Sequence, residues 1–148
     1  MDSYLKHYIN GKWVDSIGGK RHEVISPSTE EPCTEITLGT QADVDAAVSA
    51  ARQAFKTFSQ TSREERIALM NRIIEEYKKR IPDFAKSMAA EMGAPVSFAT
   101  MAQAPAGLGG FLGTLPALEN FAFKEQHGAN TVVYEPIGVV GLITPWNW

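Results

Sequence analysis

The chain has 148 residues, of which 44% are hydrophobic and 21% are charged, and this globular composition argues against disorder. Fourteen basic and seventeen acidic residues give a formal net charge of −3, so the chain lacks the positive charge by which proteins hold nucleic acid. One cysteine, Cys33, excludes an internal disulfide, and because the three histidines are scattered without ligand spacing, no metal site is expected.

The first forty residues are predicted to form short strands and turns. Asn10-Gly11 lies between two apolar segments, and this pair is typical of a two-residue hairpin because both turn positions need a positive φ. Further strands are predicted at 22–25 and 34–38 from their apolar and alternating patterns. Residues 1–12 are polar and lack a secretory signal, so a cytoplasmic protein of a reducing compartment is expected.

Two capping boxes predict the starts of two amphipathic helices. Thr40 and Asp43 begin a helix that runs to Phe58, with Asp in the place where Glu or Gln is usual. Ser62 and Glu65 form the second box, and an apolar stripe follows them.

The middle of the chain is predicted to continue as helix with interruptions. Pro82 is expected to kink the second helix or to start another, and Gly93 is a natural helix end. Residues 97–123 are expected to be helical in parts because glycines and prolines interrupt them. No charge occurs from 92 to 118, a length that could span a bilayer, yet its prolines and polar residues favour a segment buried in a larger soluble protein over a membrane span.

The pattern changes from helix to strand near the end of the chain. A strand is predicted at 131–134, and the apolar run 139–143 suits a parallel strand buried on both faces. Helices followed by one buried strand give an α/β class with an incomplete sheet, because such a strand needs neighbours that the 148 residues do not supply. We therefore expect the N-terminal portion of a longer protein, with edge coverage by another strand or a second copy as the alternative.

Most candidate chemical groups have a plain structural interpretation. Cys33 has no helix N-terminus or nearby histidine in sequence to activate it, so an inert thiol is expected. The acidic pairs of the helices, such as Glu75-Glu76, are typical of solvated faces. The run 107–112 resembles G-x-G-x-x-G but ends in leucine and follows no strand, so it predicts no phosphate site. The remaining candidate for a functional site is the segment 143–148, which follows the apolar strand at its carboxyl end, where ligands bind in open α/β sheets. From the residues alone, a turn that ends the strand is at least as good an interpretation as a ligand site.

Several motifs, in chain order, resemble those of the aldehyde dehydrogenase superfamily. Residues 135–147, Glu-Pro-Ile-Gly-Val-Val-Gly-Leu-Ile-Thr-Pro-Trp-Asn, are similar to that family's specific P-x-G-V-x-x-x-I-x-P-W-N run. The segments 8–13, 24–31, 43–55 and 91–95 also resemble family motifs, with Ser26, Glu30 and Ala94 as departures. The resemblance covers essentially the whole chain.

The resemblance implies a fold and three parts. Residues 1–123 would be the N-terminal hairpins and helices of the cofactor-binding domain. Residues 124–137 would be an oligomerisation-arm strand, and 138–148 would be the first strand and oxyanion turn of a Rossmann-like nucleotide-binding sheet. A homo-oligomer, dimer or tetramer, is the implied assembly.

The resemblance also implies the reaction, which is oxidation of an aldehyde to a carboxylic acid with NAD or NADP through a cysteine thiohemiacetal. Asn147 would donate its amide to the oxyanion of the intermediate, and removal of such a donor costs about 10²–10³ in rate. Cofactor contacts would come from four residues that precede it in the sequence. These are Ile143, Thr144, Pro145 and Trp146.

The nucleophilic cysteine and the general-base glutamate of the family have no counterpart in these 148 residues, and Cys33 matches neither. The chain alone is therefore expected to be catalytically silent and to bind the cofactor poorly. The alternative function is a non-catalytic oligomerising module that associates through strand edges and apolar helix faces.

Overall fold

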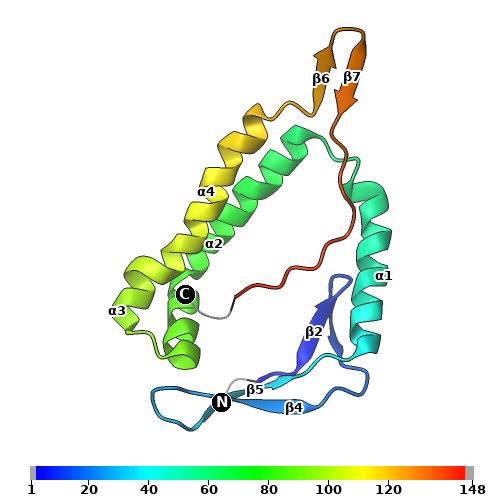
Figure 1. The fold of residues 1–148 in the computed structure, drawn as a ribbon. Helices are drawn as coiled ribbons and strands as arrows, with labels where there is room; N and C mark the ends of the chain where they lie inside the picture. The colour runs from blue at the N-terminus through cyan, green and yellow to red at the C-terminus, as the bar shows by residue number, and fades with distance from the viewer. Residues whose placement is uncertain (1–2, 146–148) are drawn as a thin grey trace.

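A computed structural model describes residues 3–145 of the chain. Two small sheets lie at one end, a long helix pair and a single helix rise from them, and a hairpin stands at the far end (Figure 1). In chain order the elements are β1 (Ser3–Tyr4), β2 (Lys6–Ile9), β3 (Lys12–Asp15), β4 (Arg21–Ile25), β5 (Pro32–Thr37), α1 (Gln41–Phe58), α2 (Arg63–Met92), α3 (Val96–Phe98), the π-helix η1 (Ala99–Gln103), α4 (Ala104–Asn120), β6 (Lys124–His127) and β7 (Asn130–Val133).

The N-terminal hairpin is confirmed, and its turn has the predicted geometry. Asn10 and Gly11 take φ values of 52° and 74°, the positive values that a two-residue turn between β2 and β3 requires. Tyr8 pairs with Trp13 across the hairpin, with ring centroids 5.1 Å apart. The strands β4 and β5 are also confirmed, whereas the two-residue β1, which pairs parallel to β5, lacked any sequence pattern.

Both capping boxes form as predicted. Thr40 accepts from the Asp43 amide while the Asp43 carboxylate accepts from the Thr40 amide, and α1 begins there. Ser62 and Glu65 make the same reciprocal pair at the start of α2. These boxes satisfy amide groups that the first turn of a helix leaves without partners.

Pro82 does not start a new helix, because α2 continues through it from Arg63 to Met92, and the alternative of a kink within α2 stays a prediction. A proline inside a helix removes one amide donor, here the one facing the Lys78 carbonyl. The helix α2 packs along α4 and η1. Gly93 ends the helix in the left-handed conformation at φ 71°, as predicted.

The only hydrophobic cluster of buried residues in the described part of the chain lies where α2 meets η1 and the start of α4. Its centre is made of Ala85, Ala99 and Ala104, each at most 2% exposed. Such small side chains allow close helix contact, and α4 runs antiparallel along α2 (Figure 1). Within residues 3–145, no helix has both the length and the apolar character needed to cross a membrane.

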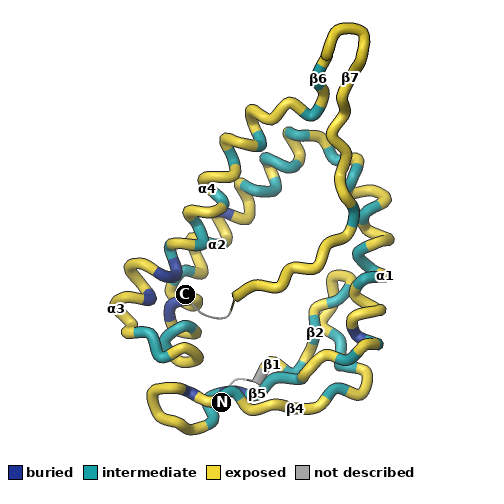
Figure 2. The backbone as a smooth tube through the Cα atoms, viewed as in Figure 1, coloured by how far each residue is buried: buried dark blue, intermediate teal, exposed yellow. Residues whose placement is uncertain are grey.

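The predicted strand at 139–143 is not a strand in this structure. The predicted strand at 131–134 forms as β7, which pairs with β6, but residues 134–145 then continue without regular secondary structure. A strand exists only where a neighbour accepts and donates its backbone hydrogen bonds, and no described segment pairs with 139–143. We call residues 134–145 the strap, and Figure 2 shows it as almost entirely exposed.

Candidate functional site

The strap leaves the hairpin and runs past α1 toward the lower end of α2 (Figure 1). Gly138 has a φ of 118°, a value that side chains disfavour, so glycine permits the bend at this position. Together with α1 residues Val48, Arg52 and Phe55, the backbone of 138–141 borders a hollow of about 410 Å³. The middle of the strap therefore lies near α1.

The end of the strap carries the residues expected to touch a cofactor. Ile143 is 99% exposed, and Thr144 and Pro145 are exposed as well. Trp146 and Asn147 lie outside the described residues. Because no described side chain shields Ile143, residues 143–145 do not by themselves enclose a nicotinamide ring.

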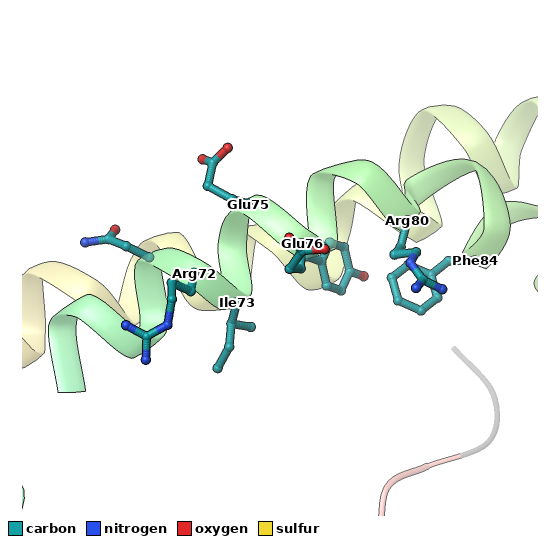
Figure 3. A pocket seen from close by; sticks show the side chains of 8 residues that line it. Arg72, Ile73, Glu75, Glu76, Arg80 and Phe84 are labelled. Atoms are coloured by element: carbon teal, nitrogen blue, oxygen red, sulfur yellow. The ribbon is translucent and has the colours of Figure 1, made fainter. Parts of the chain in front are cut away.

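An open groove of about 850 Å³ lies along the exposed face of α2 (Figure 3). Ile73, Tyr77 and Phe84 give it an apolar floor, and charged side chains surround them. Glu76 lies 2.7 Å from Lys79, and this ion pair holds the pKa of the Glu76 carboxyl below its usual range. Since the side chain of Glu76 is also two-thirds exposed, the predicted solvated face is confirmed at this residue.

The most strongly perturbed acid in the described chain is Asp43, which the sequence identified only as a helix cap. Its carboxylate accepts from the Ser16 hydroxyl at 2.5 Å, from the Ile17 amide at 2.9 Å and from the Thr40 amide at 2.8 Å. These donors, the Ser16 hydroxyl first, hold the pKa of the Asp43 carboxyl far below its ordinary value. The side chain thus joins the loop after β3 to the start of α1, which is a structural role.

The low pKa of Asp43 predicts acid sensitivity. A carboxyl with a lowered folded-state pKa stabilises the fold above its unfolded value of about 3.9, and this stability is lost as the pH falls below that value. Asp43→Asn is therefore expected to lower Tm at neutral pH and to weaken the fall of Tm below pH 4, because an amide cannot accept all three hydrogen bonds. Asp45→Asn, on the exposed face of the same helix, is the control. In thermal melts it should leave unchanged both the Tm at neutral pH and the fall of Tm below pH 4. Equal effects of the two variants would contradict this role.

Cys33 is half-buried at the start of β5, and its thiol donates to the Val24 carbonyl at 3.3 Å. This contact agrees with the expected inert thiol. Among residues 3–145, no group of three or more acidic, histidine or cysteine side chains is arranged to hold a metal ion.

Comparison with known proteins places these features in a family. A sequence-family model with the description "Aldehyde dehydrogenase family" matches residues 13–148. A 3-succinoylsemialdehyde-pyridine dehydrogenase from a Pseudomonas species is 46% identical over 149 aligned residues, which cover 100% of this chain and 31% of that protein. The chain thus spans about a third of the length of this relative.

Two solved structures share the fold. An aldehyde dehydrogenase from Bartonella henselae superposes with a TM-score of 0.84 and 40% identity, over 88% of this chain and 28% of that one. A mutant of aldehyde dehydrogenase C from Pseudomonas syringae, solved with NAD+ and octanal, gives a TM-score of 0.83 and 34% identity over 86% and 26% of the two chains. The resemblance drawn from the sequence motifs is therefore confirmed.

Proposed function

The chain belongs to the aldehyde dehydrogenase family, and from this we propose that it forms the N-terminal part of an enzyme that oxidises an aldehyde to a carboxylic acid with NAD+ or NADP+. The observation that carries the proposal is the family match over residues 13–148, which includes the Ile-Thr-Pro-Trp-Asn run of residues 143–147. A relative solved with NAD+ and octanal supports both the cofactor and the substrate class.

In the proposed reaction, Asn147 stabilises negative charge. A thiolate adds to the aldehyde carbonyl, a carbon–sulfur bond forms, and the carbonyl electron pair moves onto oxygen. A neutral amide donor near that oxygen lowers the barrier without introducing a charge of its own. Cys33 is not the nucleophile, because its thiol is bonded to the Val24 carbonyl in the sheet.

The cofactor would rest against Ile143, Thr144, Pro145 and Trp146, of which the first three are exposed on the strap. These exposed residues need further walls before they can hold a nicotinamide ring, so the 148-residue chain alone should not bind the cofactor. Activity belongs in our proposal to a protein of the relatives' length.

Self-association is part of the same proposal. All four residues of β7 are exposed, and the β6–β7 hairpin leaves strand edges without a neighbour in the described chain. Such edges readily pair with another chain. We propose that the hairpin joins a second copy of the enzyme in a dimer or tetramer.

The test compares two proteins. One is the 148-residue chain itself, and the other is an enzyme of family length whose N-terminal part is this chain. The long form is expected to reduce NAD+ or NADP+ in the presence of an aldehyde, and the absorbance of the reduced nicotinamide measures this reaction over a panel of aldehydes. Light scattering is expected to give the mass of an oligomer. The short chain is expected to give no turnover and no heat on titration with NAD+. A long form that oxidises no aldehyde, or a short chain that turns over, would contradict the proposal.

A further inference from the structure

The base of the β6–β7 hairpin is tied to the helix pair by one side chain. Arg63 begins α2, and its guanidinium reaches the end of α4, fifty-six and fifty-eight residues further along the chain. Nη1 donates to the Glu119 carbonyl at 3.2 Å, and Nη2 donates to the Phe121 carbonyl. Both bonds fall where a helix end leaves carbonyl groups without amide partners and where a cation is favoured.

Aromatic rings complete the contact. The Arg63 Cζ atom lies 5.5 Å from the centroid of the Phe123 ring, in cation–π range. Phe121 packs edge-on against Phe123 at 4.9 Å and against Tyr134 at 5.2 Å between centroids. The Tyr134 amide donates to the Phe123 carbonyl at 2.9 Å, so the two chain segments that enter and leave the hairpin are joined at this point.

The hairpin itself projects beyond the ends of α2 and α4 (Figure 1). Seven of its eight strand residues are exposed, with Glu125 alone half-buried. Contacts along the strands therefore cannot set its direction, and the groups at its base must do so.

From these contacts we infer that Arg63 is a positioning residue, which fixes the direction of the β6–β7 hairpin relative to α2 and α4. The planar guanidinium donates to two carbonyls at once while its Cζ atom lies over the Phe123 ring, and a lysine ammonium does not offer this forked geometry. The inference goes beyond the proposed enzyme activity, and it holds or fails on the 148-residue chain alone.

The test measures the spread of hairpin directions by electron paramagnetic resonance. Spin labels are placed at Lys78→Cys on α2 and Ala129→Cys in the hairpin turn, with Cys33→Ser to remove the native thiol. With Arg63 in place, the distance between the two labels is expected to give one narrow peak. In Arg63→Ala, this peak is expected to be replaced by a broad distribution of distances. Arg72→Ala, an exposed arginine of the same helix, is the matched control and should keep the narrow peak.

A second label pair separates positioning from general loss of structure. Labels at Lys78→Cys and Thr114→Cys join α2 to α4, and Arg63→Ala should leave that distance unchanged. If Arg63→Ala does not fold, Arg63→Lys and Phe123→Leu serve instead, and each should broaden the hairpin distance. The inference is overturned if the hairpin peak stays narrow in the Arg63 variants, or if both label pairs broaden equally.

Discussion

Replacing Asn147 with alanine in an enzyme of family length is expected to lower kcat by about 10²–10³ with little change in KM. The amide would donate to the substrate oxygen only after that oxygen becomes negative, so its loss raises the barrier without weakening ground-state binding. Steady-state kinetics with an aldehyde that the parent enzyme turns over measure both constants.

Two further variants locate the effect in the amide donor. Asn147→Asp keeps the size of the side chain but replaces the donor by a carboxylate, so kcat should fall at least as far as with alanine. Asn71→Ala, in the exposed groove of α2, should leave kcat unchanged. A loss of less than about tenfold for Asn147→Ala would remove the oxyanion role, because it is well below the cost of one such donor.

Elements fixed by neighbours in sequence were predicted well. The Asn10-Gly11 turn and the two capping boxes each depend on residues within three or four positions, so their sequence pattern determines the local backbone. Pro82 shows the limit of this reasoning. Its local preference allowed either a kink or a new helix, and the continuous α2, which packs along α4 and η1, excludes only the new helix.

Elements that depend on distant partners could not be predicted. The sequence identified Asp43 as a cap, but Ser16 and Ile17, which donate to it from twenty-seven and twenty-six residues away, carry no motif. The contact of Arg63 with Phe121 is likewise visible only in the fold. The apolar run 139–143 has a strand's composition, yet composition supplies no neighbouring strand, and this segment is unpaired in the described chain.

The residues proposed to hold the cofactor and the oxyanion illustrate a different limit. Ile143, Thr144 and Pro145 were identified by their motif, and the structure places them on an exposed strap without a surrounding pocket. A motif specifies which side chains the reaction needs. The residues that surround them and complete a binding site lie far away in sequence. The donors to Asp43 are a small example, because Ser16 and Ile17 are also distant from it in sequence.

The helix pair itself should be sensitive at one glycine. A Cβ atom added at Gly107 in α4 would overlap the Tyr77 hydroxyl and lie 2.9 Å from Tyr77 Cζ. The ring is held in place, because its hydroxyl donates to the Ala104 carbonyl at 2.8 Å and the ring packs tilted against Phe84 at 4.8 Å between centroids. Gly107→Ala is therefore expected to destabilise the fold by about 1–3 kcal/mol in urea unfolding, despite the better helix propensity of alanine.

Gly110 provides the matched control, because a Cβ atom there meets nothing within 4 Å. Gly110→Ala should stabilise the chain by up to about 1 kcal/mol, so the same substitution three residues apart is expected to act with opposite sign. Tyr77→Phe removes the hydroxyl that Gly107→Ala would strike, and the double variant should lose less than the two single losses added together. If the losses of unfolding free energy in the two single variants add up in the double variant, contact with the Tyr77 hydroxyl is not the reason why glycine is needed at position 107.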